Sequence, residues 1–272
     1  MAADTSPSPP LVDTHAHVFL RRLPFTPNAV HSFDRDYPTE AFVSELDAAG
    51  VKYAAIAAAS FLGNHVDYTL EALAAQSRLR ATVNADPNAD PGRLKELDCA
   101  GVVGIRLAVG NLATAPDLTE PRFQRMLTRA AELDWHVHVY SRREQLPPMV
   151  DALLQSGVKI VLDHFGARDN QSGPGAESFQ SVIRALKSGR AWIKLSGPYL
   201  SPALDHTDLA TRFLDAGGSE RLLWGSDWPF VAAGGSVRYC DAVKWLSDWM
   251  PDPAIRAQID RNALSLYRFP AE

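Results

Sequence analysis

The chain has little of what marks disulfide-rich, membrane-spanning or nucleic-acid-binding proteins. It has two cysteines, Cys99 and Cys240, too few and too far apart for a disulfide framework or a thiolate metal site. No stretch approaches the roughly 18 consecutive apolar residues of a membrane-spanning helix. The formal net charge of −5 argues against a surface that binds nucleic acid.

The first ten residues, MAADTSPSPP, lack the positively charged start and the apolar stretch of a secretory signal peptide. We therefore expect residues 1–10 to be a disordered leader and the protein to be cytoplasmic.

Short apolar runs alternate with longer amphipathic stretches along the rest of the chain, which is 272 residues long and 46% hydrophobic. The short runs are rich in β-branched and aromatic residues, as buried parallel strands are. They are Leu11 to Phe19, Val51 to Ser60, Leu79 to Asp86, Val102 to Val109, Trp135 to Ser141, Lys159 to Phe165, Ala191 to Ser196 and Leu222 to Trp228.

Eight such strands predict a single-domain α/β protein, a (β/α)8 TIM barrel over residues 11–272. Helices are expected after Thr39, which is a possible N-cap, at residues 120–133, and around Asp151, Gln180 and Ala210, with Gly50 ending the first. A doubly wound open sheet has the same rhythm, but it typically places a glycine-rich turn after the first strand. Val18-Phe19-Leu20-Arg21 is not such a turn.

Two long connections follow predicted strands. Residues 20–38 contain several prolines and aromatic residues, and residues 166–176 are rich in glycine and polar residues. Structureless loops of this length are often lids or binding loops. Both lie at the carboxyl ends of strands, where the active sites of barrels are built.

Histidines and a carboxylate suggest a hydrolytic site. His15 and His17 are two residues apart in an apolar strand, so both imidazoles point to one face and can share a metal ion or a substrate oxygen. Asp227 ends the last strand, where a carboxylate can complete a metal site or accept a proton from water. His164 ends the sixth strand in the same way.

The fifth strand alternates polar and apolar residues. His136, His138 and Tyr140 are expected to point into the barrel, with His136 deeper and the other two nearer the active mouth. Arginines gather near the carboxyl ends of strands, and their planar guanidinium groups suit carboxylate, sulfonate or phosphate oxygens. The set is Arg21, Arg22, Arg106, Arg142, Arg143 and Arg168. Among them Arg106 lies within a strand, and the substrate is predicted to be an anion.

The chain resembles the amidohydrolase-related family (amidohydrolase 2) of barrel hydrolases, in particular its 2-pyrone-4,6-dicarboxylate lactonase-like and sulfomuconolactone hydrolase-like branch. The matching segments are VDTHAHVF, AGVVGIRL, WHVHVY, LDHFG, WIKLSGPY, LLWGSDWP and DRNALSLYRF. The resemblance implies a lactonase of aromatic catabolism that opens an anionic lactone by attack of activated water on the ring ester carbonyl.

The resemblance also implies roles for single residues. Asp227 matches the carboxylate that acts as general base, and His15, His17 and His164 match the other catalytic positions. Arg106 matches an arginine that holds a substrate carboxylate. Ser60, Tyr140 and Tyr199 lie where pocket residues are expected, and Arg21 is a further candidate for substrate binding. Phe230 stands where many relatives have histidine.

The fifth strand bears on the cofactor. Similar pyrone-dicarboxylate lactonases read Trp-His-Val-Gln there and work without a divalent ion, whereas this chain has His138 at the glutamine position. His15, His17, His138 and Asp227 could therefore hold one ion of zinc or manganese. Arg106 occupies the region where a two-metal site would have its bridging lysine. Catalysis without a metal stays open, with the histidines polarising the carbonyl themselves.

Three functions are compatible with the sequence. Hydrolysis of an anionic lactone is favoured, and metal-dependent non-oxidative decarboxylation of an aromatic or unsaturated acid is the alternative. The third is a catalytically silent barrel that binds a carboxylated ligand. The expected partner is a small anionic lactone, with no nucleic acid and no membrane, and the sequence does not determine the oligomeric state.

Overall fold

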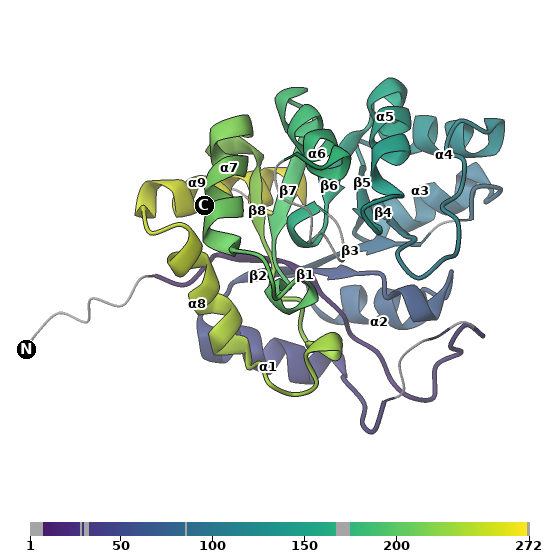
Figure 1. Ribbon diagram of the computed structural model, residues 1–272. Coiled ribbons are helices and arrows are strands. Elements are labelled where there is room, and N and C mark those ends of the chain that lie inside the picture. Colours follow the sequence, from purple (N-terminus) through teal and green to yellow (C-terminus); the bar gives the residue numbers. More distant parts are fainter. Residues whose placement is uncertain (1–7, 28, 30–32, 85, 167–174, 271–272) are drawn as a thin grey trace, which may run out of the picture.

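Eight parallel strands form one sheet in the order β1 to β8, surrounded by helices (Figure 1). The computed structural model describes residues 8–270 except residues 28, 30–32, 85 and 167–174. The strands are β1 (Val12–Ala16), β2 (Tyr53–Ala57), β3 (Leu79–Val83), β4 (Val102–Ala108), β5 (His136–Tyr140), β6 (Lys159–Leu162), β7 (Ala191–Leu195) and β8 (Leu222–Trp224).

The sheet closes between its first strand and the segment that follows its last. The backbone N–H of His17 donates to the carbonyl of Trp228 at 2.7 Å, and that of Asp227 donates to the carbonyl of His15 at 2.8 Å. The protein is thus a (β/α)8 barrel, and the predicted fold is confirmed. The strands end earlier than predicted, so Asp227 and His164 lie just beyond β8 and β6.

Helices follow the strands around the outside of the barrel. They are α1 (Thr39–Ala49), α2 (Asp67–Ala75), α3 (Pro91–Cys99), α4 (Pro121–Glu132), α5 (Leu146–Ser156), α6 (Glu177–Lys187), α7 (His206–Gly217), α8 (Tyr239–Trp249) and α9 (Pro253–Leu266). Gly50 ends α1 with φ of 73°, as predicted, because glycine adopts this left-handed conformation without strain. Thr39 is the first helical residue and Pro38 the N-cap, so the predicted cap was wrong by one residue.

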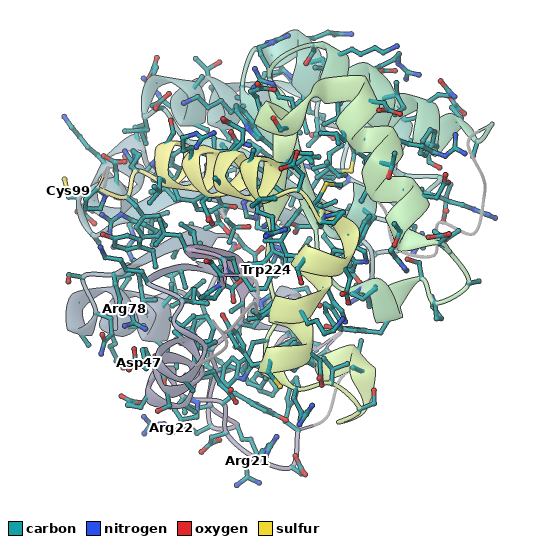
Figure 2. The ribbon with its side chains drawn as sticks, turned by 90° about the vertical axis from the view of Figure 1, so that its left-hand side faces the viewer. Arg21, Arg22, Asp47, Arg78, Cys99 and Trp224 are labelled. Atoms are coloured by element: carbon teal, nitrogen blue, oxygen red, sulfur yellow. The ribbon has the colours of Figure 1, made fainter. Side chains whose placement is uncertain are left out.

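The last helix covers the amino-terminal end of the barrel. Figure 2 shows α9 lying across the face turned toward the viewer. Residues of α9 and after it pack on side chains from five strands in an apolar cluster that contains Val12, Ala55, Val103, Val161, Leu223, Ala263, Leu266, Tyr267 and Phe269. Because this end is closed by packing, the opposite end carries the site.

The connection after β1 is partly held by aromatic packing. Phe19, Phe25, Phe33 and Tyr37 gather with Phe61 in one cluster, and Phe19 and Tyr37 pair through their backbones. Residues 1–7 of the expected leader, and most of the predicted loop 166–176 with Arg168, lie outside the described residues. Within the described part of the chain, no helix is both long and apolar enough to cross a membrane.

Candidate active site

The two histidines of the first strand meet at the carboxyl end of the barrel. His15 lies in β1 and His17 directly follows it, and the Nε2 atoms of their imidazoles are 3.3 Å apart. Both rings therefore lie on one side of the strand. Gly225 leaves room for His15, since a Cβ at that position would lie 2.6 Å from the Cβ of His15.

Asp227 brings a carboxylate to the same point. Its Oδ1 lies 3.5 Å from Nε2 of His15, 3.4 Å from Nε2 of His17 and 3.8 Å from Nε2 of His164. Asp227 and His164 have left-handed backbones, with φ of 67° and 49°. This conformation costs roughly 1–2 kcal/mol for residues other than glycine, and such strain is concentrated at functional sites.

The other ring nitrogen of each histidine is held from behind. Nδ1 of His17 is 2.8 Å from the carbonyl of Ala57, and Nδ1 of His164 is 2.9 Å from the hydroxyl of Ser196. Nδ1 of His15 lies 3.3 Å from Oδ1 of Asp163. All three Nε2 atoms thus point toward Asp227.

Burial and neighbouring charges set the protonation of this group. Burial lowers the pKa of His15 well below its ordinary value, with a further contribution from the charge of Lys194, and burial also lowers the pKa of His164. Burial alone would raise the pKa of Asp227, but His164, His17 and His15 lower it far below its ordinary value. At neutral pH the site therefore combines an ionised carboxylate with neutral imidazoles at His15 and His164.

Beneath these residues lies a charged pair that we did not predict. Nζ of Lys194, fully buried in β7, lies 3.0 Å from Oδ1 of Asp163, which is also fully buried. Nε of Arg106 donates to Oδ2 of Asp163 at 3.0 Å. Burial would raise the pKa of Asp163, but Lys194, His15 and Arg106 hold it well below its ordinary value.

The structure does not bring His138 to the group around Asp227. Nδ1 of His138 faces Lys194 at 3.4 Å and Asp163 at 3.7 Å, while its Nε2 lies 2.9 Å from the hydroxyl of Tyr267. His136 stacks beside it, deeper in the barrel, with the two Nε2 atoms 3.1 Å apart. Of the four predicted metal ligands, His15, His17 and Asp227 come together and His138 lies apart from them.

A cavity of about 70 Å³ opens beside Asp227, and it includes several of the predicted substrate-binding residues. Its lining comprises His17, Ser60, Arg106, Tyr140, His164 and Asp227, among others. A second cavity of about 240 Å³ shares Ser60, Phe61 and Asn111 with the first. The two cavities together provide a cleft for a ligand larger than a water molecule.

Arg106 contributes a cation to this cleft from β4. Its side chain is only 4% exposed, and its Nη1 donates to the carbonyl of Ala58 at 2.7 Å. The guanidinium also lies 5.3 Å from the centre of the Tyr140 ring. Arg106 is thus fixed against the protein while it lines the cavity.

Arg21 lies elsewhere. Its backbone N–H donates to Asp36 at 2.7 Å, its side chain is 57% exposed, and it does not line the cavity beside Asp227. Figure 2 shows Arg21 and Arg22 at the edge of the molecule. The predicted role of Arg21 in substrate binding stays a prediction.

Tyr199 approaches the other oxygen of Asp227. Its hydroxyl donates to Oδ2 at 2.6 Å, so Oδ1 is left to face the histidines. Gly197, whose φ is 58°, leaves room for His164, because a Cβ there would lie 2.8 Å from Nδ1 of His164. The predicted role of Tyr199 in substrate binding stays a prediction, and in the structure its hydroxyl is bonded to the carboxylate of Asp227.

Replacing Tyr199 by phenylalanine should lower kcat about tenfold, because a hydrogen bond to a charged group contributes roughly 1.5–3 kcal/mol. KM should change little if the hydroxyl acts on Asp227 alone. Steady-state kinetics of Y199F, with Y68F as control, would measure this, since the hydroxyl of Tyr68 accepts a hydrogen bond from Thr39 outside the cavity. A larger change in KM than in kcat would return Tyr199 to substrate binding.

Comparison with known proteins places this site in a family. The model of the amidohydrolase family matches residues 12–269. The chain belongs to this family. The resemblance seen in the sequence is therefore confirmed.

Two relatives that the chain resembles are named as hydrolases. The chain is 27% identical to 4-sulfomuconolactone hydrolase of Hydrogenophaga intermedia over 225 residues, which covers 80% of this chain and 74% of the relative. It is 25% identical to a protein of Comamonas testosteroni named 2-pyrone-4,6-dicarboxylate hydrolase, covering 80% of this chain and 76% of the relative.

Solved structures agree with this grouping. A probable 2-pyrone-4,6-dicarboxylic acid hydrolase of Acinetobacter baumannii, with citric acid bound, superposes with a TM-score of 0.88 at 27% identity, covering 95% of this chain and 99% of that one. A 2,6-dihydroxybenzoate decarboxylase from Rhizobium is more distant, with a TM-score of 0.69 at 15% identity and coverage of 96% and 99%. At that identity the likeness to the decarboxylase concerns the fold alone.

Proposed function

We propose that this amidohydrolase opens an anionic lactone by adding water to the ring ester carbonyl, with one divalent metal ion, zinc or manganese, in the site. The observation that carries the proposal is the convergence of three imidazole Nε2 atoms on Oδ1 of Asp227, beside a cavity that Arg106 lines. The lactone hydrolases among the relatives support the choice of substrate class.

The ligand atoms fit a first-row divalent ion. Ligands about 2.0–2.1 Å from a tetrahedral zinc lie about 3.4 Å from one another. The three distances among Nε2 of His15, Nε2 of His17 and Oδ1 of Asp227 are 3.3, 3.4 and 3.5 Å. His15, His164 and Asp227 also form one of the groups that could hold an ion.

The groups next to the Nδ1 atoms of the histidines also fit metal binding by the Nε2 atoms. Metal-binding histidines usually donate their other ring N–H to a carboxylate or a carbonyl, which fixes the ring and directs the free lone pair at the ion. Nδ1 of His17 lies 2.8 Å from the carbonyl of Ala57, and Nδ1 of His15 lies 3.3 Å from the carboxylate of Asp163, so each ring has such a group behind it. We therefore propose His15, His17 and Asp227 as the ligands, with His164 beside them, and His138 leaves the proposed set.

A bound ion would polarise the ester carbonyl and lower the pKa of water toward about 7. Asp227 accepts the proton of the attacking water, held in place by Tyr199 at its other oxygen. His164, neutral and anchored on Ser196, stabilises the oxyanion that develops on the carbonyl oxygen. Arg106 holds the anionic substituent, and Ser60 and Tyr140 supply hydrogen bonds from the cavity wall.

The alternative, decarboxylation, depended on His138 as a metal ligand. Because Nδ1 of His138 faces Lys194 and its Nε2 faces Tyr267, no separate observation favours that reaction. Carbon dioxide release is therefore measured only as a further readout of the lactone assay described next.

The deciding experiment is a pH-indicator assay on carboxylated, sulfonated and neutral sugar lactones, with added zinc or manganese and after chelation. We expect acid release from an anionic lactone, loss of at least 90% of the activity on chelation, and recovery when the ion is returned. Activity that survives complete metal removal would contradict the metal, and release of carbon dioxide without ring opening would contradict the lactonase.

A further inference from the structure

The buried ammonium of Lys194 lies at the centre of a second group of metal-binding side chains, below the proposed metal site. Its Nζ is 3.0 Å from Oδ1 of Asp163, 3.1 Å from Nδ1 of His15 and 3.4 Å from Nδ1 of His138. These three partners form a group whose ligand atoms lie within 4.8 Å of one another. We call Asp163, His15 and His138 the inner cage.

The inner cage has nearly the geometry of a metal site. Its Asp163–His15 distance is 3.3 Å and its Asp163–His138 distance is 3.7 Å, against about 3.4 Å between ligands of a tetrahedral zinc. One carboxylate and two imidazoles are also the kind of ligand set that zinc sites use. Each distance from Nζ exceeds a metal–ligand bond by about 1 Å, so the ligands would close in only moderately around an ion.

We propose that the Lys194 ammonium takes the place of a metal ion in the inner cage, and so limits the barrel to one divalent ion. The proposal rests on the proposed function only in that the single ion is the one assigned to His15, His17 and Asp227. The ammonium nitrogen lies 3.0–3.4 Å from the three cage atoms, in the position that a metal ion bound by these residues would occupy. It balances the buried charge of Asp163 with one positive charge, as the nearby Arg106 also does.

His15 connects the two sites through its ring. Its Nδ1 faces the inner cage and its Nε2 faces His17 and Asp227. If ions occupied both sites, the imidazole would bridge them after releasing its remaining ring proton to solvent. With Lys194 present, an ammonium stands on the inner side and this bridge does not form.

Removing the ammonium should open the inner cage. We expect K194A to bind one more equivalent of zinc per chain than the wild type after equilibrium dialysis against zinc, counted by elemental analysis. The added equivalent should disappear in the double variant K194A/H138A, because His138 belongs only to the inner cage. K194M is the matched control, since its side chain fills the space without a charge, and it should gain no ion.

The outcomes separate this inference from the proposed metal. If the wild type binds one equivalent of zinc per chain and K194A binds two, the result supports both the proposed metal and the inner cage. A different result is that the wild type binds no zinc and K194A binds one equivalent, which is absent from K194A/H138A. That result contradicts the proposed metal and supports the inner cage. Equal counts in K194A and K194A/H138A overturn the inner cage. Circular dichroism monitors folding, and K194S replaces K194A in the same comparison if the alanine variant does not fold.

Discussion

Replacing Asp227 by asparagine should lower kcat about 10³-fold or more. An amide is neutral and cannot accept the proton of water, and general-base catalysis together with charge stabilisation accounts for losses of this order. The substitution keeps the size of the side chain, so the left-handed turn after β8 can persist. The measurement is kcat on the best lactone of the panel, with zinc content determined on the same preparation.

D248N is the matched control. Asp248 pairs with Lys244 on the exposed side of α8, so its loss should leave turnover unchanged. Zinc content should fall in D227N and stay constant in D248N, because Asp227 is a proposed ligand. Turnover of D227N within tenfold of the wild type would contradict the hydrolytic mechanism in which Asp227 accepts the proton of water.

All eight strands and the closed barrel could be predicted because buried parallel strands leave a strong pattern of apolar, β-branched runs. The residues at which the strands end could not be predicted in this way. The polar residues of the site continue the strand pattern in the sequence, whereas the backbone turns at His164 and at Asp227, where φ becomes positive. Turns of this kind depend on contacts with neighbouring strands, which a single segment does not contain.

The site residues at the ends of the strands were predicted from the sequence. Those deeper in the barrel were missed or misplaced. Lys194 stands in Trp192-Ile193-Lys194-Leu195, and a lysine in an otherwise apolar strand is a signal for a buried charge that needs a partner. His138 was assigned correctly to the barrel interior. Its depth relative to His15 was not predictable, because depth depends on the stagger of strands around the barrel.

Replacing Arg106 by alanine should raise KM for an anionic lactone about 100-fold, because a charge-assisted hydrogen bond contributes roughly 1.5–3 kcal/mol. Arg106 is the residue of the cavity lining beside Asp227 that carries a fixed positive charge. Among the described residues, its hydrogen bonds to Asp163 and Ala58 hold the guanidinium in place. R106K should give an intermediate KM, because lysine keeps the charge without the planar group.

Arg106 also stabilises the buried Asp163, so a change in KM must be separated from partial unfolding. Comparing each anionic lactone with its neutral methyl ester makes this separation. If Arg106 binds the anion, the wild type prefers the acid over the ester and R106A loses that preference, whereas a folding defect lowers kcat/KM for both substrates alike. R212A, whose arginine pairs with Asp208 on the exposed side of α7, controls for loss of charge at a distance. An unchanged preference in folded R106A would leave Arg106 as a structural partner of Asp163 and assign the anion to another residue.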